Sequence, residues 1–231
     1  MASLIITGAS SGIGLATAQR FASADYRVVN LSRRPCPETS VHNLACDLTD
    51  PDARSAAVAE LTSLIGPSEV VHLVHNAALL RGGTTADISD DDLREVIELN
   101  VIAPTALNRG LLPHMAAGSS ILYVGSTLSE KAVPGNYSYV TTKHANIGQM
   151  RSTCQDLAGS KIHTACVCPG FTDTEMLRAH VPGDALESIA AASTFGRLVE
   201  PKEIAETLWF AAHAPVVNGA VIHANLGQIE S

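Results

Sequence analysis

Aromatic residues and charged residues are both scarce in this chain. Of its 231 residues, 4% are aromatic and 16% are charged, whereas about a quarter is the usual charged share. Acidic residues outnumber basic ones by 23 to 15, and the net charge is −8. A nucleic-acid groove needs a basic surface, and so does binding to an anionic membrane. We therefore expect no nucleic acid and no membrane among the partners.

Long hydrophobic runs and metal-ligand spacings are also absent from the sequence. No apolar run reaches the length of a membrane span, and Met1-Ala2-Ser3 brings no basic region that would indicate a signal peptide. The cysteines have none of the spacings of a zinc site, so we predict no metal, and their odd number suits a reducing compartment. They are Cys36, Cys46, Cys154, Cys166 and Cys168. We expect a soluble, cytoplasmic protein.

Glycine and proline occur at ordinary frequencies, with 17 and 11 residues, and 46% of the chain is hydrophobic. This composition excludes a disordered or collagen-like chain. The sequence contains no internal repeat, low-complexity tract or linker that would divide it. We therefore expect residues 1–231 to form one globular domain.

Short apolar runs alternate with helix-length segments along the whole chain. Turn residues bound these runs, as is typical of buried parallel strands. The predicted strands are Leu4–Thr7, Arg27–Ser32, Val41–Ala45, Val70–His75, Ile121–Gly125, Ile162–Val167 and Ala220–Ala224. The predicted helices are Gly12–Ala24, one that follows Pro51, one from Ser89 through Asn100 to Met115, Tyr137–Ala158 and Pro201–Ala212. The alternation predicts an α/β fold, a doubly wound Rossmann-type parallel sheet of about seven strands with helices on both faces.

Two stretches stand apart from this alternation. Residues 35–40 contain two prolines and leave no room for a helix between the second and third strands. Residues 171–197 follow the sixth strand, and ligands of doubly wound sheets bind beyond the carboxyl ends of the strands. We expect this segment to be a substrate-binding lid whose apolar residues suit a moderately hydrophobic substrate. Those residues are Phe171, Met176, Leu177, Val181, Leu186 and Ile189.

A glycine-rich turn follows the first strand and opens the first helix. Gly8, Gly12 and Gly14 have the spacing Gly-x3-Gly-x-Gly. Glycine lets the backbone turn sharply toward a ligand, and the free N–H groups of a helix N-terminus suit phosphate. A purely structural turn is the alternative, but its place between a strand and a helix favours the pyrophosphate of a dinucleotide. The predicted cofactor contacts here are Gly8, Ser10, Ser11, Gly12, Ile13 and Gly14.

The end of the second strand indicates which dinucleotide binds. An acidic residue at this point favours NAD because it holds the ribose hydroxyls. Here Asn30-Leu31-Ser32 is followed by Arg33 and Arg34, and arginine pairs well with a 2′-phosphate. The pair therefore favours NADP(H). Two solvated surface arginines are the structural alternative.

Tyr139 and Lys143 are spaced to lie on one face of a helix. A phenol needs a stabilised anion to exchange a proton near neutral pH, and a neighbouring ammonium supplies that stabilisation. This is the arrangement of a general acid for carbonyl reduction or a general base for alcohol oxidation. The spacing alone is common and mostly structural. Ser126, thirteen residues before Tyr139 at a strand end, adds a hydroxyl for a substrate oxygen.

Taken together, these motifs strongly resemble the classical short-chain dehydrogenase/reductase family, in the family's order and over almost the whole chain. Thr7-Gly8 with Gly12 and Gly14 resembles its cofactor motif, and Asp47-Leu48 its adenine-contact pair. Asn76-Ala77 matches part of its Asn-Asn-Ala-Gly segment. The catalytic tetrad of the family is matched by Asn100, Ser126, Tyr139 and Lys143. Its nicotinamide-side turn is matched by Pro169, Gly170, Thr172 and Thr174.

The resemblance implies a role for each member of the tetrad. Tyr139 would be the acid/base, and Ser126 would orient the carbonyl or hydroxyl of the substrate. Lys143 would hydrogen-bond the nicotinamide ribose and stabilise the Tyr139 anion, and Asn100 would position a water in a proton relay. NADP(H) would carry the hydride. A homodimer or homotetramer is also implied.

The sequence departs from the family pattern at three places. Ala78 replaces the glycine of Asn-Asn-Ala-Gly, Asn225-Leu226-Gly227 replaces Asp-Gly-Gly, and the helix after the second strand is missing. Tyr137 and Ser129 are rivals of Tyr139 and Ser126, but Tyr137 has no ammonium one turn later and Ser129 lies past the strand end.

Three functions remain open on the sequence. The first is an NADP(H)-dependent oxidoreductase acting on a carbonyl and secondary-alcohol pair. A 3-oxoacyl thioester reductase is the second, although the charge of −8 counts against docking of an acidic acyl carrier. The third is a dinucleotide-binding regulator without turnover, because a fold alone does not prove chemistry.

Overall fold

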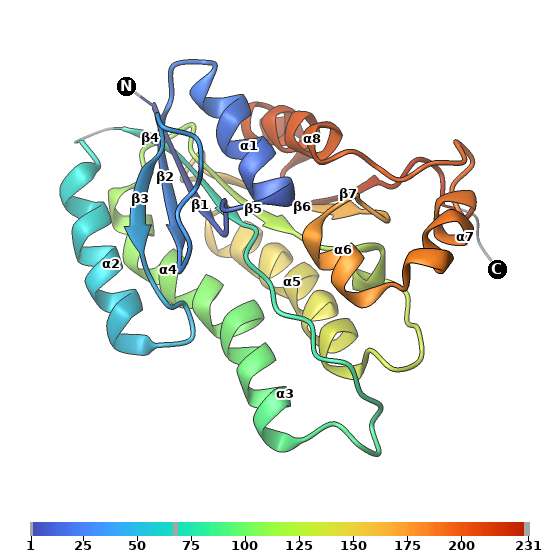
Figure 1. Ribbon diagram of the computed structural model, residues 1–231. Coiled ribbons are helices and arrows are strands. Elements are labelled where there is room, and N and C mark those ends of the chain that lie inside the picture. Colours follow the sequence, from blue (N-terminus) through green and yellow to red (C-terminus); the bar gives the residue numbers. More distant parts are fainter. Residues whose placement is uncertain (1, 67–68, 229–231) are drawn as a thin grey trace.

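The computed structural model describes residues 2–66 and 69–228. Within these residues, seven strands form one parallel sheet in the order β3-β2-β1-β4-β5-β6-β7 (Figure 1). The strands are β1 (Ala2–Thr7), β2 (Arg27–Ser32), β3 (His42–Ala45), β4 (Val70–His75), β5 (Ser120–Val124), β6 (His163–Pro169) and β7 (Ala220–Ala224). The predicted doubly wound fold is confirmed, and most strand ends agree with the prediction to within two residues.

Helices cover both faces of this sheet (Figure 1). The α-helices of the described residues are α1 (Gly12–Ala22), α2 (Pro51–Leu64), α3 (Asp90–Ile97), α4 (Ala103–Leu111), α5 (Tyr137–Asp156), α6 (Glu175–His180), α7 (Leu186–Ala191) and α8 (Pro201–His213). Short 3-10 turns are Leu112–His114, Thr127–Ser129, Gly183–Ala185 and Pro215–Val217. None of the described helices combines the length and apolarity needed to cross a bilayer.

Two hydrophobic cores fill the space between the sheet and its helices. On one face, Phe21 of α1 and Leu208 of α8 pack against alternate residues of the central strands. On the other face, Leu61 of α2, Leu107 of α4 and Met150 of α5 pack against the intervening residues. The central strands are therefore buried on both sides, which is why most of their residues are apolar.

The predicted helix from Ser89 to Met115 is interrupted. A π-helical turn over Glu98–Ile102 separates α3 from α4. Pro104 has no N–H to donate to the carbonyl four residues earlier, and its ring crowds that carbonyl, so the regular ladder breaks at Asn100. The Asn100 carbonyl is instead bonded by the side-chain amide of Asn146 on α5, at 2.9 Å. The interruption thus locks this helix to α5.

The connection from β2 to β3 contains no helix, as the two prolines predicted. It runs over residues 33–41 on the face covered by α1 and α8, where Cys36 and Val41 enter the core. Residues 171–197 contain two short helices, α6 and α7, that the sequence pattern did not predict.

Two histidines of β4, His72 and His75, are buried in the neutral form. His72 Nδ1 lies 2.8 Å from the hydroxyl of Ser120, and His75 Nε2 lies 2.8 Å from Asn108 Oδ1. Burial lowers the pKa of His72 to about 3 and that of His75 to about 4. His72 packs against Phe21 of α1, with the ring centroids 5.9 Å apart.

These histidines predict a loss of stability in acid. Below pH 6.5 these two imidazoles are protonated in the unfolded chain but stay neutral in the folded chain. The free energy of unfolding therefore falls as the pH falls. Each of the two histidines costs about 1.4 kcal/mol per pH unit until its folded pKa is reached. We expect the free energy of unfolding, measured with urea, to fall between pH 6.5 and pH 4.5 with the sum of these two slopes.

The variant His72→Asn tests this cause, because asparagine can still bond Ser120 but does not titrate. It should remove about half of the slope. His144→Asn, at an exposed position on α5, serves as the control and should leave the slope unchanged. An acid slope that is equal in all three proteins would exclude the buried histidines as its source.

Candidate active site

The predicted site residues meet at the carboxyl edge of the sheet, where the parallel strands end together. The glycine turn follows β1, the arginines follow β2, and Asp47-Leu48 follows β3. Asn76-Ala77 follows β4, Ser126 follows β5, and Pro169-Gly170 closes β6. α5 brings Tyr139 and Lys143 to the same edge.

The glycine turn has a backbone that only glycine adopts readily. Gly8 and Gly12 have φ of 73° and 56°, in the left-handed region. A Cβ added to Gly14 would lie 2.3 Å from the carbonyl oxygen of Gly8. The turn is therefore packed too tightly for a side chain at Gly14.

Thr7 and Asn76 support the glycine turn from below. The Thr7 hydroxyl accepts hydrogen bonds from the amides of Asn76 and Ala77, both at 3.0 Å. The Asn76 side chain donates to the carbonyl oxygens of Thr7 and Gly8, also at 3.0 Å. Asn76 thus joins the end of β4 to the turn, while its role as a direct cofactor contact stays a prediction.

The N-terminus of α1 is open to an anion. Ser11 occupies the N-cap position but makes no side-chain cap bond, whereas Asp50 caps α2 and Ser89 caps α3. The first-turn amides of α1 are thereby left for another acceptor, and the helix dipole favours a negative charge there. This uncapped end, set in the glycine cradle, fits a dinucleotide pyrophosphate.

The Asp47-Leu48 pair is held by an arginine that the sequence reading missed. Arg54 Nη1 donates to the Leu48 carbonyl at 2.6 Å and pairs with Glu98 at 2.7 Å. Arg54 is buried, and nothing in the sequence of this helix indicated that its side chain would be. It ties the chain after β3 to the π-helical turn that carries Asn100.

Arg33 and Arg34 are exposed at the end of β2. Hydrogen bonds from the Thr49 hydroxyl and amide lower the pKa of the Asp47 carboxyl, and the nearby charge of Arg33 adds to this effect. Arg34 Nη2 lies 3.3 Å from Glu175 Oε2 at the start of α6. This ion pair therefore joins the chain after β2 to the start of α6.

Ser126 is half-buried at the N-cap of the 3-10 turn Thr127–Ser129. Its hydroxyl accepts from the Leu128 amide at 3.1 Å, and its own amide donates to the Ser129 hydroxyl at 3.1 Å. Ser129 is buried, so its hydroxyl serves this turn and not a substrate. The turn packs against α5 and brings Ser126 to the tyrosine helix.

Tyr139 and Lys143 lie on the inner face of α5. The Lys143 ammonium is buried, donates to the Val124 carbonyl at 2.7 Å and lies 5.3 Å from the centroid of the Tyr139 ring. Because Val124 is two residues before Ser126, this bond places the ammonium beside the serine turn. Tyr137, the rival tyrosine, is 43% exposed. The structure thus brings together Ser126, Tyr139 and Lys143.

Asn100 is buried, and its side chain joins two segments. It accepts from the Leu79 amide at 2.8 Å and donates to the Leu79 carbonyl at 2.9 Å. It also donates to the Thr142 hydroxyl at 3.0 Å. These bonds fix the chain after β4 against α5. The main-chain carbonyl of Asn100 accepts from the Asn146 side-chain amide and keeps a second lone pair.

The turn after β6 presents one of its two threonines to the glycine cradle. A Cβ on Gly12 would lie 3.1 Å from Thr174 Cγ2, so Thr174 borders the glycine turn. Thr172 is buried and its hydroxyl donates to the Gly170 carbonyl at 3.0 Å, where it supports the turn. Thr174 caps α6 by accepting from the Leu177 amide at 3.2 Å.

Cys166 and Cys168 lie on one face of β6, since side chains two residues apart on a strand point the same way. Both are buried, and their sulfur atoms are 3.9 Å apart. The hydrogen bond between the thiols raises the pKa of Cys166 and lowers that of Cys168. A Cβ on Gly125 would lie within 3 Å of both sulfurs, so the pair fills the core tightly.

Residues 171–197 are fastened at both ends. Near the start, the Val199 amide donates to the Phe171 carbonyl, and the Asp173 amide donates to the Val199 carbonyl, both at 2.9 Å. Near the end, the Thr194 amide donates to the Gly227 carbonyl at 3.0 Å. The part between these anchors carries α6 and α7.

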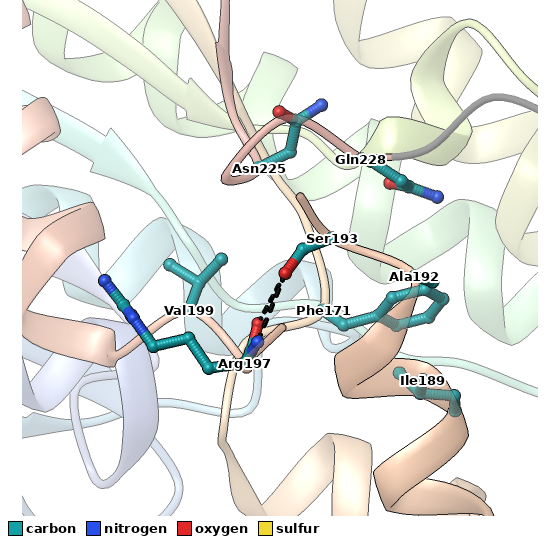
Figure 2. A pocket seen from close by; sticks show the side chains of 8 residues that line it. All are labelled: Phe171, Ile189, Ala192, Ser193, Arg197, Val199, Asn225 and Gln228. Carbon is teal, nitrogen blue, oxygen red and sulfur yellow. Dashed lines mark hydrogen bonds between the residues drawn. The ribbon is translucent and has the colours of Figure 1, made fainter. Parts of the chain in front are cut away.

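Figure 2 shows a pocket at the base of this segment, where Phe171 and Ile189 face Asn225 and Gln228. Ser193 closes one side by donating to the Arg197 carbonyl at 2.9 Å. The pocket has room for about one water molecule. It is therefore a narrow seam between the segment and the end of β7.

Known proteins similar to this chain agree with the geometry. A family model described as enoyl-(acyl carrier protein) reductase matches residues 8–228. The 3-oxoacyl-[acyl-carrier-protein] reductase MabA of Mycobacterium avium is 30% identical over 98% of this chain and 89% of its own length.

Solved structures agree as well. A short-chain dehydrogenase family protein from Francisella tularensis subsp. tularensis SCHU S4 has a TM-score of 0.89 at 25% identity, with 98% of each chain covered. A short-chain dehydrogenase from Burkholderia cenocepacia J2315, solved in complex with NADP, has a TM-score of 0.87 at 25% identity, over 98% of this chain and 97% of that one. The chain belongs to the short-chain dehydrogenase/reductase family of oxidoreductases.

Proposed function

We propose that this chain is an NADP(H)-dependent oxidoreductase that interconverts a carbonyl and a secondary alcohol, with Tyr139 as the acid/base. The observation that carries the proposal is the buried Lys143 ammonium, 5.3 Å from the Tyr139 ring and bonded to the end of the strand that leads into Ser126. A buried cation beside a phenol favours the phenolate, which is what proton exchange near neutral pH requires.

The four residues of the tetrad divide the work of the reduction among them. When bound, NADP(H) would supply the hydride for the carbonyl carbon. Tyr139 gives its phenolic proton to the carbonyl oxygen, and the Ser126 hydroxyl donates a hydrogen bond that holds this oxygen in place. Lys143 stabilises the resulting phenolate and has two hydrogens beyond the one on Val124 for the ribose and for a relay water. The Asn100 carbonyl holds that water, through which the phenolate recovers a proton.

The uncapped N-terminus of α1 would hold the pyrophosphate, and the arginines after β2 would hold the 2′-phosphate. Arg33 is the principal contact, since Arg34 is paired with Glu175. Asp47-Leu48 would border the adenine, and Thr174 with Pro169-Gly170 would border the nicotinamide. The complex of a similar dehydrogenase with NADP supports this choice of dinucleotide.

Arg33→Ala is expected to weaken NADPH binding by about tenfold, because an exposed charge-assisted hydrogen bond to the 2′-phosphate is lost. NADH lacks this phosphate, so its dissociation constant should stay the same. Fluorescence titration with the two cofactors measures the difference. Equal losses for NADPH and NADH would show that Arg33 does not read the 2′-phosphate.

Residues 171–197 would form the substrate lid. Its ends are anchored, and the side chains of Phe171 and Met176 are exposed although apolar, at 38% each. Such residues suit a moderately hydrophobic carbonyl compound. The substrate would bind between this lid and the edge that carries Ser126 and Tyr139.

A 3-oxoacyl thioester reductase is the second candidate function, and the similarity to MabA favours it. The net charge of −8 counts against docking of an acidic carrier protein, so small thioesters are the better substrates to test. A panel of ketones, aldehydes and 3-oxoacyl thioesters, followed by NADPH oxidation with NADH in parallel, decides between the two. No oxidation of NADPH by any member would favour a dinucleotide-binding regulator.

The protein would act in the cytoplasm as a homodimer or homotetramer. Size-exclusion chromatography with light scattering tests the assembly, because one chain has a mass of 24.1 kDa. A single species of that mass would exclude the oligomer.

A further inference from the structure

The crossover between β2 and β3 is unusually short for parallel strands. It consists of residues 33–41, whereas parallel neighbours are usually joined by about a dozen residues or more, most often a helix. A helix would satisfy its own backbone groups and keep its ends in place. This crossover carries Arg33 and Arg34 at its start, so something else has to hold them.

Two asparagines face each other beneath the crossover. Asn30 of β2 and Asn43 of β3 are partners in the parallel register. The side-chain amide of Asn30 donates to Asn43 Oδ1 at 2.9 Å. Asn30 is buried, and Asn43 lies on the edge strand with part of its side chain exposed. They occupy the face on which the missing helix would pack.

Both asparagines bind the crossover backbone. Asn43 Oδ1 accepts from the Cys36 amide at 2.7 Å, and its Nδ2 donates to the carbonyls of Cys36 at 3.3 Å and Val41 at 3.5 Å. Asn30 Nδ2 also donates to the Arg34 carbonyl at 3.4 Å. The chain on the carboxyl side of the two arginines is therefore tied to the sheet at several points.

Asn30 also forms a hydrogen bond with the glycine turn. Asn30 Oδ1 accepts from the Ala9 amide at 2.9 Å, in the middle of the glycine-rich turn. The Gly8 amide donates to the Leu31 carbonyl, also at 2.9 Å. A continuous chain of hydrogen bonds thus runs from the glycine turn through Asn30 and Asn43 to the crossover.

We propose that Asn30 and Asn43 are positioning residues for cofactor selection. They hold the crossover that carries the arginines at a fixed distance from the glycine turn. A dinucleotide spans these two features, with its pyrophosphate on the turn and its 2′-phosphate on the arginines. A preorganised backbone lowers the entropy lost when the arginines bind this phosphate. The inference rests on the proposed use of NADP(H) and of Arg33.

Asn43→Leu is the decisive variant, because leucine has a similar size and the edge position is exposed. We expect NADPH to bind about fivefold more weakly and NADH to bind with unchanged affinity, since only the 2′-phosphate uses the crossover. Asn43→Ala, which adds no apolar surface to the edge strand, provides the same comparison should the leucine variant be insoluble. A merely structural role would affect both cofactors alike or neither.

Asn218→Leu is the matched control. Asn218 is also exposed and also anchors a backbone amide, that of Thr164 at 2.9 Å, but beside the amino ends of the strands. This variant should leave both dissociation constants unchanged. A loss of NADPH affinity as large as that of Asn43→Leu would overturn the proposal.

A double-mutant cycle with Arg33 shows whether Asn43 acts through the arginine. In an Arg33→Ala background, Asn43→Leu should change NADPH affinity by less than about twofold, because the contact it positions is already gone. Full additivity of the two effects would overturn the proposal. An Arg33→Ala variant with unchanged NADPH affinity would instead contradict the proposed function, so the two failures are distinguishable.

Discussion

Replacement of Tyr139 by phenylalanine is expected to lower kcat by about three orders of magnitude, within the range that general acid–base catalysis contributes. The change removes one hydroxyl and leaves the ring, which packs on α5 beside the Lys143 ammonium. The proton donor is lost, while the glycine turn and the arginines remain. NADPH should therefore bind with unchanged affinity, as fluorescence titration would measure alongside steady-state turnover.

Tyr137→Phe is the matched control for this prediction. Tyr137 lies on the same helix, but it is exposed, and the residue one turn later is Thr141, whose hydroxyl donates to the Tyr137 carbonyl at 2.8 Å. This variant should keep wild-type turnover. Undiminished turnover in Tyr139→Phe would refute the assignment of the acid/base, and absence of turnover in the wild type would favour the regulator.

Gly14→Ala is expected to weaken NADPH binding by about 100-fold and to lower the free energy of unfolding by about 1–3 kcal/mol. The new methyl group would lie 2.3 Å from the Gly8 carbonyl oxygen and 2.5 Å from the Asn76 side-chain nitrogen. Neither atom can move without breaking the bond that joins β4 to the turn. The first-turn amides of α1 would shift with it. Titration with NADPH and urea unfolding measure the two effects.

Gly148→Ala separates this clash from the general effect of alanine in a helix. Gly148 is exposed on α5, and a Cβ there would meet no atom within 4 Å. Alanine is the better helix former, so this variant should be more stable by about 0.5–1 kcal/mol and should bind NADPH normally. Similar behaviour of the two variants would show that the crowding at Gly14 is not the cause.

The strands could be predicted because the residues of each strand themselves show that it is buried. A strand covered on both faces, such as β1 or β4, consists mostly of apolar residues, and its ends are marked by turn residues. The break between α3 and α4 was not predicted, although Pro104 is visible in the sequence. Its position allows either a kinked helix or a π-helical turn, and the bond from Asn146 to Asn100 favours the second.

Residues that join segments distant in the sequence were not predicted to do so from the sequence. Arg54 was placed on a helix with no sign of burial, yet it holds Leu48 and Glu98 together. Asn30 was noted only because it is not acidic. Its partners, Ala9 and Asn43, are distant in the sequence and adjacent only after the sheet has formed.

The sequence by itself determined the alternation of strands and helices, the glycine turn and the Tyr139–Lys143 pair. Each of these depends on residues within a few positions of one another, so local spacing carries the information. The tertiary structure alone decided which groups the Lys143 ammonium contacts, how the crossover after β2 is held, and that Arg34 meets Glu175. These contacts join residues that only the packing of the parallel sheet brings together, because hydrogen bonds and ion pairs form wherever partners approach and leave no periodic pattern along the chain.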